Sequence, residues 1–159
     1  MSRKVWEFMT KEPPAVVPSD SVAKALNLLK EVSDSAPGVQ SLIVTDPATG
    51  SLKGVVTLRR IVEGLRKAMG LPPGQDDQDF WERPELSSRL RQEAERVKVK
   101  EVMAKRIYQV KPYDTIGKAM DLMLEKKVRG IPVVENQKVI GVIRMRDIFA
   151  QLHQRVAGG

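Results

Sequence analysis

Two stretches of the chain carry the same pattern, in which a run of β-branched residues gives way to an amphipathic helix. Residues 52–62 read L-K-G-V-V-T-L-R-R-I-V, and residues 139–149 read V-I-G-V-I-R-M-R-D-I-F. A short apolar run bounded by charge predicts a buried strand, and the change of period after Arg144 predicts the start of a helix. Asp147 falls in the first helical turn, where a carboxylate suits the positive end of the helix dipole. The pattern therefore predicts two copies of one strand–turn–helix unit.

The repeat extends over most of the chain, and each copy reads in the order β-α-β-β-α. Met9 aligns with Met103, and further along Gly54 aligns with Gly141. The first copy is longer, in two loops at 33–38 and 46–50 whose Gly, Pro, Ser and Asp residues suit tolerant connections. We expect strands at 15–17, 41–45, 52–57, 107–110, 131–135 and 139–143, and closing helices at 58–69 and 145–154.

A capped helix with an apolar stripe is predicted inside each copy. Residues 19–21 (Ser-Asp-Ser) and 113–115 (Tyr-Asp-Thr) offer side-chain oxygens to the first free N–H groups of a helix. Apolar residues then recur at helical spacing and define a core-facing stripe in each helix: Val22, Ala25, Leu26, Leu28 and Leu29 in the first, and Ile116, Ala119, Met120, Met123 and Leu124 in the second.

The domain organisation that follows is an α+β module of two repeats, residues 1–69 and 99–155, separated by a connector at 70–98. A copy of about 55 residues cannot bury its helices and both faces of its sheet alone. We therefore expect the two copies to pack sheet to sheet, around a pseudo-twofold axis, and to share one core.

The connector differs in character from the repeats. Leu-Pro-Pro-Gly at 71–74 ends the preceding helix, and an acidic loop follows at 75–79. Residues 84–97 predict a charged helix with acidic and basic side chains one turn apart. Phe80 and Trp81 are candidates to anchor the connector to the body or to a second subunit.

Composition indicates an ordinary water-exposed globular domain, with 42% apolar and 30% charged residues. The chain has no cysteine, which excludes disulfides and zinc–cysteine sites. It has no apolar run near the ~18 residues of a membrane span, and no apolar segment follows Arg3 and Lys4 as in a signal peptide. We expect a cytoplasmic location.

The formal charge of +7 is concentrated in one segment, because residues 83–111 hold nine Lys or Arg against four Asp or Glu. A basic strip of this kind would meet phosphate, nucleic acid or an acidic partner. The alternative is a solvated helix face with its linker, and the sequence leaves both open.

Catalysis has little support in the sequence. A single histidine, His153, and no cysteine remove most catalytic triads and metal sites. No Gly-rich phosphate loop is present, and the acidic loop at 75–79 lacks the Gly and terminal Glu of a calcium loop. We expect no enzyme activity, no metal and no required cofactor.

With both copies in view, the chain resembles a tandem pair of CBS domains, the unit called a Bateman module. Three features occur twice, in order and at matching spacing: the V-x-E-φ-M opening, the P-x-x-[ST]-[VI] helix start, and Gly-φ-φ before the closing helix. A fourth, G-I-P-V-V at 130–134, marks the first strand of the pair in the second copy. The resemblance implies a regulatory module that binds AMP, ADP, ATP or S-adenosylmethionine between repeats, dimerises into a flat disk, and acts on a separate protein.

The ligand motif of that family resembles Gly-φ-φ-[Ser/Thr]-x-x-Asp, and this chain splits it between the copies. The first keeps Thr57 but has Arg60 in place of the Asp; the second keeps Asp147 but has Arg144 in place of the hydroxyl residue. An arginine fork can grip phosphate, whereas losing the Asp removes the acceptor for a ribose diol. We expect the better site at Asp147, with Arg144 facing phosphate, and an empty or anion-binding site around Thr57, Arg59 and Arg60.

The family places the purine base against the start of each repeat and the turn before its second strand. By position, the resemblance implies a base wall from apolar and backbone groups, with Arg129 facing the ligand: Pro14, Ala15, Val16, Val39 and Gln40 in the first copy, and Arg106, Ile107, Tyr108, Val128, Arg129 and Ile131 in the second.

Each of these assignments has a plainer alternative. Asp147 can be a helix-start carboxylate, Arg144 and Arg60 can be surface residues at sheet ends, and Tyr108 can lie at the edge of a core. Two other functions stay open for the whole chain: a basic accessory protein that binds nucleic acid, and a degenerate pair that serves only dimerisation or docking.

Overall fold

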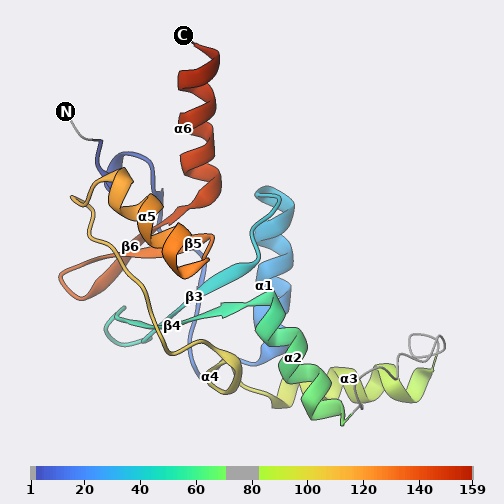
Figure 1. Ribbon diagram of the computed structural model, residues 1–159. Coiled ribbons are helices and arrows are strands. Elements are labelled where there is room, and N and C mark those ends of the chain that lie inside the picture. The colour runs from blue at the N-terminus through green and yellow to red at the C-terminus, as the bar shows by residue number, and fades with distance from the viewer. Residues whose placement is uncertain (1–2, 71–82, 159) are drawn as a thin grey trace. The chain divides into compact units, whose positions relative to one another are not determined.

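The computed structural model describes residues 3–70 and 83–158 (Figure 1), and the fold mixes helices and sheets as the sequence predicted. The elements in chain order are a short 3-10 helix η1 (Val5–Glu7), β1 (Thr10–Lys11), β2 (Ala15–Val16), α1 (Val22–Ser35), β3 (Ser41–Thr45), β4 (Leu52–Thr57), α2 (Leu58–Met69), α3 (Pro84–Arg96), α4 (Val99–Val102), α5 (Ile116–Lys126), β5 (Gly130–Glu135), β6 (Lys138–Arg144) and α6 (Met145–Ala157).

The chain divides into two compact units that are not the two sequence repeats. Unit 1 comprises Met1–Pro13, Thr45–Leu52 and Arg106–Gly159, and unit 2 comprises Pro14–Val44 and Lys53–Lys105. Each unit contains one three-stranded sheet, ordered β1-β6-β5 in unit 1 and β2-β3-β4 in unit 2. The opening segment of each repeat thus belongs to the unit built mainly from the other repeat.

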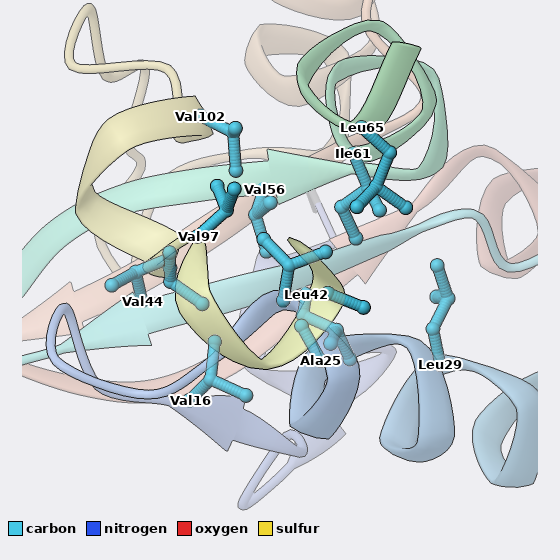
Figure 2. Packing of buried hydrophobic residues seen from close by; sticks show 13 residues of the cluster. Val16, Ala25, Leu29, Leu42, Val44, Val56, Ile61, Leu65, Val97 and Val102 are labelled. Carbon is cyan, nitrogen blue, oxygen red and sulfur yellow. The ribbon is translucent and has the colours of Figure 1, made fainter. Parts of the chain in front are cut away.

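Unit 2 is built around β3, which pairs in parallel with β2 and neighbours β4. Leu42 and Val44 of β3, Val56 of β4 and Ile61 of α2 are almost fully buried. Figure 2 shows their side chains converging with those of α1 and of the segment that follows α3. Burying such side chains stabilises the fold by about 1.5–3 kcal/mol each.

The helix starts in both units have the caps that the sequence predicted. The Ser21 hydroxyl accepts a hydrogen bond from the Lys24 N–H at 3.1 Å, and the Thr115 hydroxyl accepts from the Lys118 N–H at 3.1 Å. The α1 stripe packs as predicted, but Leu124 of α5 is 68% exposed. The other four predicted residues of α5 pack in the unit 1 core, and Leu122 joins them in place of Leu124.

The strand predicted at 107–110 is wrong in its length, because only Val110 pairs, in a parallel bridge with Val133. Val110 donates to the Pro132 carbonyl and accepts from the Val134 N–H. The next bond of a parallel ladder would need a donor at residue 132, and proline has no N–H. The first copy has Leu42 at this position and does form the ladder between β2 and β3.

The connector helix α3 is part of unit 2. It packs on α1 and α2, and Ala94 with the adjoining Val97 is buried in the unit 2 core. The predicted helix at 84–97 is therefore confirmed to within one residue. It is more than a link between the repeats, because it contributes side chains to the unit 2 core. The acidic loop at 75–79 and the Phe80–Trp81 anchor lie outside the described residues.

The opening segments, residues 4–11 and 98–105, repeat the same local structure. Glu7 accepts a hydrogen bond from the Lys4 N–H at 2.7 Å, and Glu101 accepts from the Lys98 N–H at 2.6 Å. Each carboxylate satisfies a free N–H at the start of a short helical turn. This bond gives the glutamate of V-x-E-φ-M a structural role in both copies.

Two glycines allow the opening segments to reach the sheets. β1 pairs antiparallel with β6, with Lys11 opposite Gly141, and a Cβ at Gly141 would lie 2.8 Å from the Thr10 carbonyl oxygen. In unit 2, a Cβ at Gly54 would lie 2.7 Å from the Ala104 carbonyl oxygen. Cβ atoms do not approach backbone oxygens this closely, so both positions require glycine.

The methionines of the opening segments lie over these same glycines. Met9 packs against the unit 1 core and Met103 against the unit 2 core, both half-buried. Each methionine therefore belongs to the core of the opposite repeat.

Replacing Gly141 by alanine is expected to destabilise the fold by about 1–3 kcal/mol, because the added methyl forces Thr10 and β1 away from β6. Urea unfolding monitored by circular dichroism measures the change. The matched control is Gly117→Ala, because Gly117 is exposed in α5 and a Cβ there would make only an ordinary van der Waals contact, 3.8 Å from the Thr115 hydroxyl oxygen. Alanine is the better helix former there, so the control is expected to be neutral or stabilising. Equal unfolding midpoints for the two variants would contradict the close approach.

Candidate functional site

The candidate site in unit 1 is formed where β6 ends and α6 begins. Arg144 is the N-cap of α6, with extended backbone, and Asp147 lies three residues later. The Asp147 Oδ2 accepts a hydrogen bond from the Arg144 N–H at 2.8 Å. Both side chains are half-buried, so the carboxylate is held in place by the backbone while its second oxygen makes no hydrogen bond within the described chain.

In unit 2 the start of the closing helix is capped by a hydroxyl group instead of a carboxylate. Thr57 is the N-cap of α2, and its hydroxyl accepts a hydrogen bond from the Arg60 N–H at 3.2 Å. A complete capping box would combine this bond with a carboxylate three residues on. Each copy keeps one half, because Arg60 replaces the carboxylate in unit 2 and Arg144 replaces the hydroxyl in unit 1.

A second backbone bond fixes the start of each closing helix. The Met145 N–H donates to the Arg129 carbonyl at 2.7 Å, and the Leu58 N–H donates to the Gln40 carbonyl at 2.8 Å. Arg144 also pairs with Gly130 in the sheet. Arg129, Arg144 and Asp147 are therefore brought to one end of the unit 1 sheet.

The Arg144 side chain lies beside Gly130 of β5. The Arg144 Cγ lies 3.6 Å from where a Cβ at Gly130 would be. Arg129 is exposed beside it. Within residues 3–70 and 83–158, Arg144 and Arg129 form no ion pair with a carboxylate.

Electrostatics at this end of the sheet reflect partial burial of both charges. Burial raises the pKa of the Asp147 carboxyl, and the opposing effects of the Arg144 N–H, Arg144 and Arg146 do not cancel it. Burial likewise lowers the pKa of the Arg144 guanidinium, although Asp147 acts to raise it. The pair offers one acceptor of fixed position and one desolvated cationic fork, which can bind a diol and an anion, respectively.

The remaining residues predicted for unit 1 have different surroundings. The Tyr108 ring is half-buried, with the Lys126 ammonium 5.5 Å from its centre, while Arg106 is exposed. Val128 packs partly buried against the unit 1 core, and Ile131 lies fully inside it. Ile131 can therefore contribute only backbone groups to a base wall.

The residues predicted for unit 2 are less favourably placed. Val16 and Val39 are buried, so their side chains face the interior, whereas Ala15 is exposed. Arg60 is exposed, and Arg59 pairs with Glu63 at 3.1 Å. Among the predicted residues, Thr57 and Arg60 are joined by the cap, and no described carboxylate takes the place that Asp147 has in unit 1.

The sequence reasoning missed an apolar face on α6. Met145, Phe149, Leu152 and Val156 recur at spacings of four, three and four residues and are all exposed. This spacing was readable in the sequence as a helix-pairing pattern. His153 is exposed and stacks on Phe149 with ring centres 6.1 Å apart.

The segment at 83–111 is divided between the units, because Arg106 and Lys111 belong to unit 1 and the other basic residues to unit 2. On α3, Arg96 pairs with Glu93. In the described part of the chain, no helix is long and apolar enough to cross a membrane, and no group of three or more His, Cys, Asp or Glu residues is arranged to hold a metal.

Comparison with known proteins identifies the family and agrees with the fold. The CBS domain family matches residues 5–67 and 99–154, which together make up most of the chain. The chain therefore belongs to the CBS-domain family, as a tandem pair. The fold class and the family predicted from the repeat are both confirmed.

Three relatives illustrate the range of this similarity. An uncharacterized 33.4 kDa protein in a ribosomal RNA operon of Thermofilum pendens is 22% identical over 144 residues, which are 91% of this chain and 38% of that protein. The chain spans less than half the length of the curated relatives it matches.

The other two relatives, CBSX2 and protein MJ0100, are known from three solved structures. CBSX2 from Arabidopsis thaliana has a TM-score of 0.73 at 25% identity over 99% of both chains. A CBSX2 structure in complex with AMP has a TM-score of 0.69 at 27% identity, over 96% of this chain and 98% of that one. The CBS domain pair of protein MJ0100, solved with 5′-methylthioadenosine and S-adenosyl-L-methionine, shares the fold with a TM-score of 0.71 at 16% identity, covering 98% and 99%.

The titration of Asp147 is expected to contrast with that of Asp114, which accepts a similar bond from the Lys111 N–H at 2.8 Å. Burial acts to raise the pKa of Asp114, but the Lys111 N–H and the Lys118 ammonium together hold it below the usual range. Carboxyl NMR titration should place Asp147 above the ordinary aspartate pKa and Asp114 below it.

The two shifts have opposite consequences for stability. The folded chain holds the Asp147 proton more tightly than the unfolded chain, so the contribution of Asp147 to stability falls as pH rises through its folded-state pKa. The contribution of Asp114 is lost instead as pH falls through its lowered pKa. Titration of the two carboxyls in the reverse order would contradict this assignment.

Proposed function

We propose that the chain is a non-catalytic regulatory CBS pair, which binds an adenine nucleotide or S-adenosylmethionine and acts on a separate partner protein. The single observation that carries this proposal is Asp147, a half-buried carboxylate fixed through one oxygen by the Arg144 N–H. The structure of CBSX2, which aligns with this chain over 98% of its own length, has been solved in complex with AMP. This similarity supports an adenosyl ligand for the present chain.

The chemistry of recognition follows from the groups at the end of the unit 1 sheet. The second oxygen of Asp147 would accept a hydrogen bond from a ribose hydroxyl, which favours ligands with a ribose diol. Asp147 would not need to move to make this bond. Val128, Tyr108 and the backbone around Ile131 would supply apolar surface and polar edges for a purine. Arg106, Arg129 and Arg144 would supply positive charge.

The unit 2 turn is proposed as the weaker site. Thr57 is occupied as a helix cap, and Arg60 stands where an acceptor would be needed for a ribose. Arg60 and the nearby backbone can still attract an anion. Ala15, Val16 and Val39 would bound that site mainly through backbone groups, because the two valines are buried.

Regulation would proceed by population shift. A ligand that binds only one arrangement of the CBS pair stabilises that arrangement by mass action. A partner protein that recognises the same arrangement then binds more tightly, because more of the chain is in that arrangement. No catalytic step is required of any residue in this scheme. Nucleic-acid binding through the segment at 83–111 is a weaker candidate, because that segment is shared between two units.

The experiment is a thermal-shift screen with AMP, ADP, ATP and S-adenosylmethionine at millimolar concentration. At least one of them is expected to raise the melting temperature, and Asp147→Asn to abolish the shift. Asparagine keeps an acceptor for the Arg144 N–H but loses the carboxylate charge, so the cap is preserved. Thr57→Ala is expected to lower the melting temperature of the free protein, since a lost cap costs about 1 kcal/mol, but to retain the ligand shift.

The matched control is Asp121→Asn, an exposed carboxylate on α5. It is expected to leave the shift unchanged. Melting curves that none of the four ligands alters would overturn the proposed function.

Self-association is proposed through the apolar face of α6. The equivalent positions of α2 are Leu58, Val62, Leu65 and Met69, of which α3 and the core cover the last two, leaving Leu65 9% and Met69 2% exposed. Leu152 and Val156, at the matching positions of α6, are 49% and 84% exposed. Figure 1 shows α6 running outward from the end of β6, and within unit 1 it contacts α5 and β6.

A second copy of the chain would cover this face, because the four-three-four spacing suits helix against helix. Sedimentation velocity at micromolar concentration should therefore show a dimer, and Phe149→Glu should convert it to a monomer, since a buried charge would be unpaired. Gln154→Glu, an exposed change on the same helix, is expected to leave the dimer intact. A dimer that persists in Phe149→Glu would place the interface elsewhere.

A further inference from the structure

The charges at the end of the unit 1 sheet are unbalanced. Arg144 and Arg129 flank the same point, where Arg144 pairs with Gly130 and the Arg129 carbonyl accepts from the Met145 N–H. Neither guanidinium forms an ion pair within the described residues. Asp147, the nearby carboxylate, is engaged with the Arg144 backbone and not with its side chain.

A half-buried guanidinium without a partner has lost part of its hydration and gained no compensating bond. Burial of this kind is unfavourable for the charged form, and an anion that reaches the fork relieves it. The fork presents paired N–H donors in a plane, which match two oxygens of one phosphate group. A hydroxyl in this position would offer a single neutral donor and no net charge.

The same charge discriminates against cationic ligands. S-adenosylmethionine carries a sulfonium centre next to its ribose, on the side where a nucleotide carries its first phosphate. A guanidinium facing that position would attract the phosphate and repel the sulfonium, and partial burial strengthens both effects because the local screening is weaker than in water.

We propose that Arg144, supported by Arg129, makes this site selective for adenosyl ligands that carry phosphate, against both uncharged adenosine and S-adenosylmethionine. This selectivity rests on the proposed function, since it concerns the ligand held by Asp147. Arg144 is thereby a specificity-determining residue, and Asp147 supplies the affinity for the nucleoside that all these ligands share.

Isothermal titration calorimetry of the full chain with adenosine, AMP, ADP and S-adenosylmethionine tests the proposal. ADP is expected to bind at least about tenfold more tightly than adenosine, the gain typical of a charge-assisted hydrogen-bonded pair, and S-adenosylmethionine more weakly than AMP. The preference for ADP over adenosine should shrink as salt rises.

Three variants assign the preference to its residue. Arg144→Thr is expected to weaken ADP binding much more than adenosine binding, and so to remove most of the preference for ADP. Arg144→Lys, which keeps the charge but not the fork, should retain an intermediate preference. Arg155→Thr is the matched control, because Arg155 is an exposed arginine in the last turn of the same helix, and it should leave the preference unchanged. Melting curves without ligand establish that each variant is folded.

The outcomes separate this inference from the proposed function. Adenosine binding as tightly as ADP, or Arg144→Thr weakening both ligands equally, would overturn the selectivity while leaving an adenosyl-binding module. Tight S-adenosylmethionine binding that Arg144→Thr does not improve would also overturn it. If none of the four compounds binds, both the proposed function and the selectivity fail.

Discussion

The close approach of each opening segment to a glycine in the opposite repeat is the constraint on which the rest of the structure depends. Thr10 and Ala104 place carbonyl oxygens where a side chain at Gly141 or Gly54 would lie. The contact brings Val5 and Val99 into cores that their own repeats do not build. Each core therefore contains residues of both repeats, and neither repeat can form its complete core without the other. The candidate site lies only three residues beyond Gly141, so the same pairing positions the start of α6.

The start of each closing helix has both a structural and a proposed functional role. The family motif of a hydroxyl residue followed by an aspartate three positions later is also the pattern of a capping box. In unit 2 the hydroxyl of Thr57 satisfies a helix N–H, and in unit 1 the carboxylate of Asp147 does so. Helix capping alone is therefore a sufficient structural reason for Thr57 in unit 2 and for Asp147 in unit 1. Within the described residues, the start of α6 has a carboxylate oxygen without a hydrogen bond, beside two arginines without an ion pair, whereas Arg60 takes the place of the carboxylate at the start of α2.

Much of the fold could be predicted from the sequence, because the duplicated pattern reports local structure twice. The bounds of β3, β4 and α2 were predicted to the residue, and α1, α3 and α5 by their caps or periodicity. The short pairing at Val110 was missed because it depends on the lack of an N–H at Pro132 in a distant strand. The exchange of opening segments was missed for a related reason, since contacts between distant segments leave no periodic trace. The sequence predicted that Arg144, Asp147 and Arg129 belong to the site. The structure shows why they are neighbours, because the register of β5 and β6 pairs Gly130 with Arg144.

Residue-resolved hydrogen exchange on the full chain tests the exchanged opening segments most directly. Val5 and Val99 are both fully buried, in the unit 1 and unit 2 cores, respectively. Val5→Ala leaves a cavity in unit 1, so it should lower the protection of amides in α5, β5 and β6 more than that of β3 and β4. Val99→Ala should produce the reverse pattern. Loss of protection in β3 and β4 on replacing Val5, with β5 and β6 unaffected, would contradict the exchange.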